Sequence, residues 1–314
     1  MNDKYTSFSP LMTTGILLVL IITLFTAVKP QFLSVSNIGF ILNQSTAYMI
    51  LAVAMTFVIT TGGIDISVGS QIALTGVVTG HALVIWNFPL WLCLITALLV
   101  GALLGAFNGF FVTKMKVPPI IVTLGTFTLY RGLAYVILEY RTLFRFPQEF
   151  LWISRGRILP LLPMSLLIAI TFGIIAYFVF NETKLGRYIT AVGGNEDASR
   201  LSGINVDKAK FFSFVIMGLA SGLASITLLS RLGAAQASLA YGYEFHTIAA
   251  TVLGGTAIMG GKGILVGSFL GAVVLGVMEN GLVVVGLGYE TQQVILGLAF
   301  IAIVVFRTIQ EKDA

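Results

Sequence analysis

Residues 90–112 read LWLCLITALLVGALLGAFNGFFV and contain no charged side chain. About 20 predominantly apolar residues in a helix cover the hydrocarbon core of a membrane, which is about 30 Å thick. Water is absent from that core, so a segment inside it must satisfy its backbone hydrogen bonds internally, as a helix does. This stretch therefore predicts a membrane-spanning helix.

Apolar runs of this kind follow one another along the whole chain. Further strong candidates occur at 13–28, 42–60, 70–86, 120–138, 163–180, 211–230, 264–286 and 292–306. The stretch 245–259 is shorter and glycine-interrupted, which is typical of a span, a re-entrant hairpin or a broken helix. With it included, the pattern predicts an all-α integral membrane protein of about ten transmembrane helices, with a single transmembrane domain over residues 1–314.

The composition and the placement of charge support a membrane protein. The chain has 314 residues, 57% hydrophobic and 10% charged, whereas soluble domains carry about 25% charged residues. Of its 18 lysines and arginines, eleven fall on the side of the N-terminus, six on the opposite side, and Arg131 near membrane depth. The positive-inside rule then predicts that both termini are cytoplasmic, although the arginines of 141–157 oppose it. The same placement explains the net charge of +5 without a nucleic-acid partner.

One internal repeat is visible. GGIDISVGS at 62–70 and GGKGILVGS at 260–268 agree at six of nine positions, and each ends one apolar segment and opens the next. Glycine-interrupted segments at matching positions point to a translocation path, while the alternative is that glycine-rich turns resemble one another by chance. The span count puts both copies on the same side, which predicts a parallel repeat. Its candidate path or turn residues are Gly62, Gly63, Asp65, Ser67, Gly260 and Gly261.

Three ionisable residues are expected at membrane depth, where such groups are costly and usually have a role. Asp65 either faces the translocation path or caps the helix that starts near Ser67. Arg131 and Glu279 are expected near span ends, where their side chains would snorkel to the interface.

The polar loop 181–210 predicts a short helix between two spans. Asn195 is a suitable N-cap, Glu196 and Asp197 suit the positive first turn, and Gly203 is a natural stop.

The predicted face of this helix around Ala198 and Leu201 is small and apolar. It suits docking into a groove of a partner protein, and the alternative is an ordinary solvated connector.

The second polar loop, 139–162, combines basic and aromatic side chains. They are Arg141, Arg145, Arg155, Arg157, Phe146, Phe150 and Trp152. Arginine and aromatic residues are enriched at protein interfaces, but an interfacial helix within an aromatic belt explains them equally well.

Signatures of an enzyme are missing from the sequence. Two histidines, His81 and His246, form no plausible metal cluster with the single cysteine, Cys93. The GGKG at 260–263 lacks the spacing of a phosphate-binding loop. We therefore expect no catalytic residue, no metal, no cofactor and no ATP hydrolysis by this chain itself.

The chain closely resembles the ribose-type sugar permeases of bacterial ABC importers, a group that includes branched-chain amino-acid permeases. The resemblance covers about 30–306. Its marks, in order, are GGIDISVGS at 62–70, VPPIIVTLGT at 117–126, YRG at 130–132, GR at 186–187, GGNE at 193–196, LSGI at 201–204, LGG at 253–255 and GGKG at 260–263.

The resemblance implies a permease pair, identical or different, in the bacterial inner membrane. Two cytoplasmic ATPases would drive the pair, and a periplasmic or lipid-anchored sugar-binding protein would deliver a pentose, hexose or deoxyhexose. It also implies that residues 194–204 form a coupling helix that contacts the ATPase, and that Gly193, directly before them, belongs to the same coupling loop. The arginine-rich outer loop becomes a candidate dock for the binding protein. Autoinducer-2 and branched-chain amino acids are the alternative solutes, and a secondary carrier is the rival class.

Overall fold

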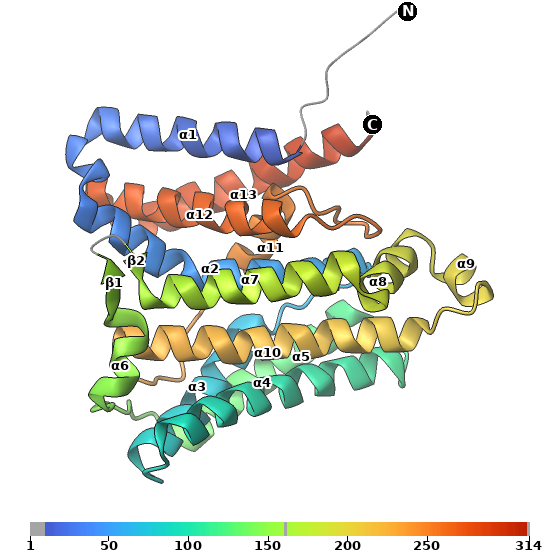
Figure 1. The fold of residues 1–314 in the computed structure, drawn as a ribbon, viewed down its shortest axis with the longest axis horizontal. Coiled ribbons are helices and arrows are strands. Elements are labelled where there is room, and N and C mark those ends of the chain that lie inside the picture. Colours follow the sequence, from blue (N-terminus) through green and yellow to red (C-terminus); the bar gives the residue numbers. More distant parts are fainter. Residues whose placement is uncertain (1–9, 160–161, 313–314) are drawn as a thin grey trace, which may run out of the picture.

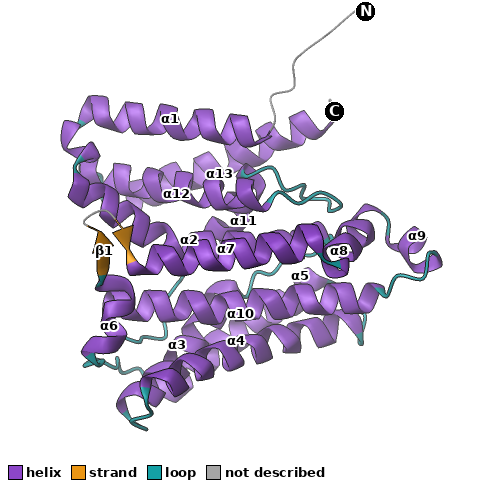
Figure 2. Ribbon diagram, in the orientation of Figure 1, coloured by secondary structure: helices purple, strands orange, loops and turns teal. Residues whose placement is uncertain are grey.

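Helices make up most of the residues that the structure, a computed structural model, describes: 10–159 and 162–312 (Figure 2). They are α1 (Pro10–Val28), α2 (Val35–Thr60), α3 (Val68–Val84), α4 (Leu90–Thr113), α5 (Pro119–Leu138), α6 (Gln148–Arg155), α7 (Met164–Glu182), α8 (Lys184–Gly194), α9 (Glu196–Leu201), α10 (Val206–Leu232), α11 (Tyr243–Leu253), α12 (Leu265–Val285) and α13 (Tyr289–Lys312). A 3₁₀ turn, η1 (Pro30–Leu33), follows α1, and β1 (Arg157–Leu159) pairs with β2 (Leu162–Pro163) in an antiparallel hairpin.

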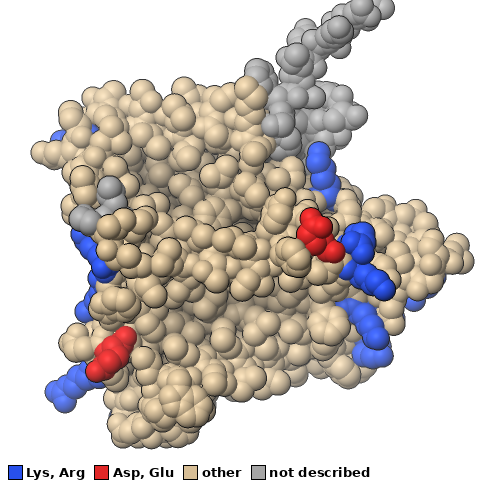
Figure 3. Space-filling model, viewed as in Figure 1, with Lys and Arg blue, Asp and Glu red and all other residues tan. Residues whose placement is uncertain are grey.

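The long helices lie side by side and give the molecule two ends (Figure 1). We call them the α6 end, where α6 and the β-hairpin lie, and the α9 end, from which α9 projects. The charged side chains visible in Figure 3 lie toward these two ends, with a band free of visible charge between them. Apolar side chains such as Leu99, Leu103 and Ile174 are exposed, as expected for helices that face lipid.

Seven helices, α1, α2, α4, α5, α7, α10 and α12, are long and apolar enough to cross a membrane. The apolar part of α13 and the half-helices α3 and α11 are shorter. Non-helical segments lead into α3 and α11, so in both places the chain passes through the bundle partly as a loop and partly as a helix (Figure 1). The predicted all-α, multi-pass membrane fold is confirmed, and the number of about ten spans stays a prediction. Helix α1 begins and α13 ends at the α9 end; residues 1–9 and 313–314 lie outside the described residues.

Two of the predicted membrane segments, 70–86 and 245–259, are short helices that a non-helical segment precedes. After α2, residues 61–67 turn back from the α9 end and lead into α3, and after α10, residues 233–242 lead from the α6 end into α11. The two half-helices begin next to each other, since a Cβ built on Gly69 would lie 2.4 Å from the carbonyl oxygen of Ala240. The stretch 245–259 is thus a broken helix, because α11 stops at Leu253 and a loop leads on to α12.

The order of elements in α2–α5 recurs in α10–α13 and runs in the opposite direction. Each set has a long helix, a non-helical segment, a half-helix and two further helices. Since α2 starts at the α6 end and α10 at the α9 end (Figure 1), the repeat of the fold is inverted. The motifs at 62–70 and 260–268 do face the same end, as expected. However, the two motifs follow α2 and α11, and in the repeat of the fold α2 corresponds to α10 and not to α11. The prediction of a parallel repeat, which rested on these motifs, was therefore wrong.

Small residues allow the two repeats to interlock. Helix α4 of the first repeat packs against α10 of the second, and a Cβ on Gly101 or Gly105 would lie 2.3 or 2.2 Å from a backbone oxygen of α10. Helix α12 packs against α2, where a Cβ on Gly276 would lie 1.8 Å from Ser45 Oγ. Close backbone approach of this kind holds membrane helices together where no hydrophobic force drives association.

Candidate functional site

The helix predicted in the loop 181–210 is present as α9. The Asn195 side chain accepts a hydrogen bond of 2.9 Å from the Ala198 backbone N–H, which is an N-cap, and Gly203 follows the helix with φ of +78°. Leu201 is 90% exposed, so α9 carries a bare apolar side chain at its tip. The described side chains of this chain do not cover it.

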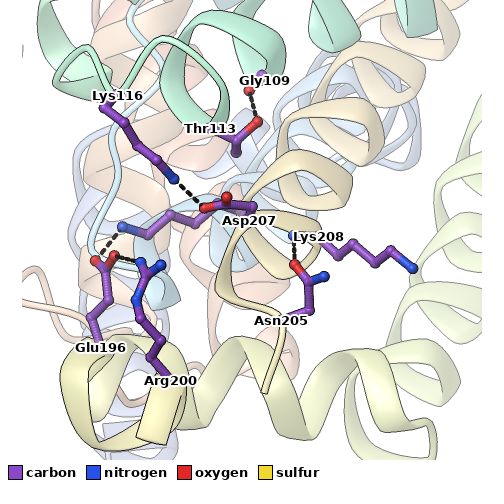
Figure 4. Close-up of polar contacts among 9 residues, drawn as sticks. Gly109, Thr113, Lys116, Glu196, Arg200, Asn205, Asp207 and Lys208 are labelled. Carbon is purple, nitrogen blue, oxygen red and sulfur yellow. Dashed lines mark hydrogen bonds and ion pairs between the residues drawn. The ribbon is translucent and has the colours of Figure 1, made fainter. Parts of the chain in front are cut away.

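An ion pair between Lys210 and Glu196 tethers α9 to α10 (Figure 4). Lys210 Nζ lies 2.5 Å and Arg200 Nη2 lies 3.1 Å from the two oxygens of Glu196. The hydrogen bond from Lys210, helped by Arg200, holds the pKa of Glu196 below its ordinary value. Close by, Lys116 Nζ lies 2.6 Å from Asp207 Oδ1 and links the turn before α5 to the start of α10. The base of α9 is therefore fixed to the helices behind it.

Gly193, near the end of α8, lies in close contact with two glycine turns from elsewhere in the chain. We call Gly62, Gly193, Gly260 and Gly261 the glycine junction. Gly261 N–H donates to the carbonyl of Thr60 at 3.0 Å. A Cβ on Gly193 would lie 1.7 Å from that same oxygen and 2.5 Å from Gly261 N, and a Cβ on Gly260 would lie 3.0 Å from Gly62 N. Backbone packs on backbone here, and at Gly193 there is no room for a side chain.

The junction joins two groups of residues that the sequence left apart. Gly193 belongs to the predicted coupling loop, whereas Gly62, Gly260 and Gly261 belong to the predicted path or turns. Gly194 and Gly63 lie beside the junction, as a Cβ on Gly261 would come within 3.0 Å of Gly194 Cα. The available signal was that the three turns are each a Gly-Gly pair at the same predicted end of the molecule. Through this contact, α9 adjoins the segments that lead into α3 and toward α12.

Asp65 lies in the non-helical segment before α3 and is fully buried. One carboxylate oxygen accepts from the Ser67 N–H at 2.9 Å and from its hydroxyl at 2.6 Å, and the other accepts from Gln71 Nε2 at 2.9 Å. Asn108 of α4 donates to the Ser67 hydroxyl at 2.9 Å. The carboxylate therefore holds the turn that leads into α3, at its N-cap residue Ser67, and a polar network extends from it to the neighbouring helix; the first turn of α3 has no side-chain cap.

Arg131 does not snorkel as predicted. Its Nη1 donates to the carbonyls of Ala237 and Leu239 at 2.6 and 2.8 Å, and the side chain is 9% exposed. The free carbonyls of the non-helical segment 233–242 need a donor at this depth. This requirement keeps the guanidinium inside the protein.

Glu279 does not snorkel either. Its carboxylate lies 2.7 Å from His246 Nε2 and accepts from the Tyr48 hydroxyl and from Gln44 Nε2, each at 3.0 Å. The His246 and Tyr48 rings stack with centroids 5.2 Å apart. Partners from α2 and α11 hold the carboxylate of α12 in place, so the expectation that it reaches the interface was wrong.

The arginines of the outer loop lie at the α6 end. Arg141 pairs with Glu139 at 3.5 Å, and Arg155 Nε donates to the Arg231 carbonyl at 3.2 Å. Arg155, Arg157 and Arg231 line a cavity of about 260 Å³. Arg145 lies in the same loop and has φ of +68°.

The aromatic residues of this loop serve different purposes. Phe146 and Phe150 are buried, at 5% and 0% exposed, and their rings meet edge to face 5.5 Å apart. Trp152 is 53% exposed. Of these three residues, the interpretation as an aromatic belt therefore fits Trp152 alone, because Phe150 of α6 and Phe146 of the preceding loop are buried in the bundle.

Glycine-interrupted segments that end in half-helices inside a bundle are typical of membrane transporters. Seven helices that can cross a membrane, two such half-helices and a tethered helix outside the bundle define a multi-pass transport protein. The chain belongs to the family described as the permease component of branched-chain amino acid transport systems, whose model matches residues 37–304.

Curated relatives fall within the same class. The ribose import permease protein of Haemophilus influenzae is 41% identical over 271 residues, which are 85% of this chain and 83% of that protein. The D-allose transport system permease protein of Escherichia coli K12 is 33% identical, over 96% of this chain and 90% of that protein. The autoinducer 2 import system permease protein of Enterobacter sp. 638 is 31% identical, over 95% and 92%. No solved structure gives a significant match to the chain.

Proposed function

We propose that this chain is the membrane-spanning permease subunit of an ATP-driven importer for a sugar: a pentose, hexose or deoxyhexose. Relatives named for ribose, D-allose and autoinducer 2 import support the solute class. The chain would act in the bacterial inner membrane with the α9 end in the cytoplasm. It would pair with a second permease subunit, alike or different, and provide the translocation path rather than catalysis.

The observation that carries the proposal is the exposed α9 with its base in the glycine junction. An apolar side chain at the tip of a short helix outside the bundle suits a groove on a cytoplasmic ATPase. Residues 193–203, including Asp197, Ala198 and Leu201, would form the coupling element. Movement of α9 would reach the turns at Gly62 and Gly260 directly, so ATP-driven closure of the ATPases could change the packing around α3 and α12.

At the other end, the arginines of the outer loop would receive the sugar-binding protein. Arg155 and Arg157 beside a cavity offer positive charge to acidic side chains of that partner, and Arg141 and Arg145 extend the charge along the loop. Charged groups at a rim steer association and fix orientation more than they add affinity. Specificity would then lie mostly in the binding protein.

The buried Glu279–His246 pair favours a second candidate, an ion-coupled secondary carrier, because intramembrane ionisable groups often relay protons. The test is gentle-detergent purification of the tagged chain from its native membrane, followed by mass spectrometry of stoichiometric partners. Recovery with an ATPase subunit supports the importer. Recovery alone, with sugar flux into liposomes that lack ATP, would establish the carrier instead.

A further inference from the structure

The non-helical segment between α10 and α11 puts polar side chains on the molecular surface. Gln236, Ser238 and Tyr241 are exposed, Tyr241 at 73%, while Ala237 and Leu239 beside them are buried. The segment contacts Arg131, the thirteenth of the 20 residues of α5, so it lies well within the length of that helix. Polar residues are therefore exposed in the part of the molecule that the membrane surrounds.

This segment is a fixed part of the structure. Arg131 holds two of its carbonyls, and the guanidinium lies 5.7 Å from the centre of the Tyr241 ring. Ala240 packs on the first turn of α3, where a Cβ on Gly69 would lie 2.4 Å from both the Ala240 carbonyl and Glu244 Oε2. The shape of the segment is thus set by α3, α5 and α11 together.

Lipid cannot cover such a surface. Non-helical backbone at membrane depth occurs only where protein buries it or where it lines a water-filled cavity. Beside Arg131, α5 also exposes the polar side chain of Thr128, and a Cβ on Gly125 or Gly132 would meet no atom within 4 Å, so this part of the helix is open. Elsewhere α5 exposes apolar side chains such as Leu124 and Val136, as α4 does at Leu103.

We infer that Gln236, Ser238 and Tyr241, with Thr128 of α5, line the water-filled translocation path and contact a neutral, polyhydroxylated solute. We call these four residues the polar wall. The inference rests on the proposed function for the solute. The wall offers an amide, two aliphatic hydroxyls and a phenol, which both donate and accept hydrogen bonds without net charge. The charge of Arg131 is directed at backbone carbonyls, and Glu244 lies near it, so the wall itself suits an uncharged ligand.

The chain permits a direct test of water access, because Cys93 is its only cysteine and is buried. In a Cys93→Ala background, Ser238→Cys and Leu103→Cys are treated with a charged, membrane-impermeant thiol reagent in native membranes. We expect Ser238→Cys to react at least tenfold faster than Leu103→Cys. A rate no faster than that of Leu103→Cys would overturn the inference, whether lipid or a second permease copy covers the wall.

Contact with the solute has its own test. Ribose, at saturating concentration with the assembled transporter, should protect Ser238→Cys from the reagent if ribose is carried, and the other pentoses and hexoses are tried in turn. Gln236→Ala should raise the KM of uptake about five- to tenfold, the loss expected for one hydrogen bond, with membrane abundance unchanged. Fast labelling without protection by any transported solute, together with an unchanged KM, would refute the contact. Labelling does not require transport, so failure of the importer proposal would be seen separately, as absence of ATP-driven uptake.

Discussion

Gly193 and Gly194 offer a matched pair of substitutions at the base of the proposed coupling element. Both residues end α8, where replacing glycine by alanine favours the helix by up to about 1 kcal/mol. A Cβ on Gly193 would lie 1.7 Å from the Thr60 carbonyl oxygen, whereas a Cβ on Gly194 would meet no atom within 4 Å. Gly193→Ala must therefore separate α8 from the end of α2, while Gly194→Ala leaves the glycine junction intact.

The size of the effect follows from the overlap. Contacts of a Cβ below 3.0 Å are essentially never found, so the backbone must move apart by at least 1.3 Å (3.0 minus 1.7). Overpacking of this kind costs about 1–3 kcal/mol. If the whole of this cost falls on the state in which the ATPase and the permease are coupled, the population of that state decreases roughly five- to 150-fold. We expect Gly193→Ala to assemble with its ATPase and hydrolyse ATP but to lose most solute uptake.

The assay is uptake of solute per ATP hydrolysed by the complex in proteoliposomes, with Gly194→Ala as the control. Recovery of each complex by size-exclusion chromatography checks that assembly is unaffected. Equal coupling ratios for the two variants would refute the role of the junction. A loss of both activities in Gly193→Ala alone would assign the junction to assembly rather than to coupling.

Four further outcomes are expected. Leu201→Arg should abolish uptake while membrane insertion, followed by fractionation, stays normal; undiminished uptake would remove α9 from the coupling role. Asp65→Ala should destabilise the purified chain by about 1–3 kcal/mol, because buried donors lose their acceptor, whereas Asp65→Asn keeps one acceptor oxygen for them; thermal unfolding in detergent compares the two. Reversing the charges of Arg155 and Arg157 to glutamate should weaken stimulation of ATP hydrolysis by the binding protein, and an unaltered response would leave this loop as a membrane anchor. The pKa of Glu196 is lowered, so its ion pair with Lys210 of α10 holds at neutral pH and is lost as the pH falls through that lowered value. Hydrogen exchange of the α9 backbone should then accelerate at acidic pH. In Glu196→Gln it should be fast at neutral and at acidic pH alike.

The sequence was sufficient where structure depends on local pattern. Apolar runs located the spans because lipid imposes both length and helical hydrogen bonding. Asn195 and Gly203 located α9 because caps act within one turn. The similarity of residue types at matched spacing was also enough to identify the family.

What failed depends on partners far away in the chain. Nothing near Arg131 in the sequence reveals that its acceptors are carbonyls about a hundred residues later, and Glu279 likewise meets Tyr48 and His246 only through packing. The inverted repeat depends on the directions in which corresponding helices cross the bundle, and the similarity between 62–70 and 260–268 carries no information about those directions. The glycine junction was missed for the same reason, although each of its turns was noticed.

The exchange of partners between the two repeats restricts how this subunit can change shape. Helix α4 packs on α10 through close backbone contacts, and α12 packs on α2 where Gly276 faces the Ser45 side chain; neither contact leaves room for an added Cβ. In many carriers one repeat rocks against the other. Here such a movement would have to separate α4 from α10 and α2 from α12. The freedom that remains belongs to the short half-helices and to rotation of the subunit as a rigid body. A transporter built from such units needs a second body to rotate against, and the alternation of access becomes a property of the assembly rather than of the single chain.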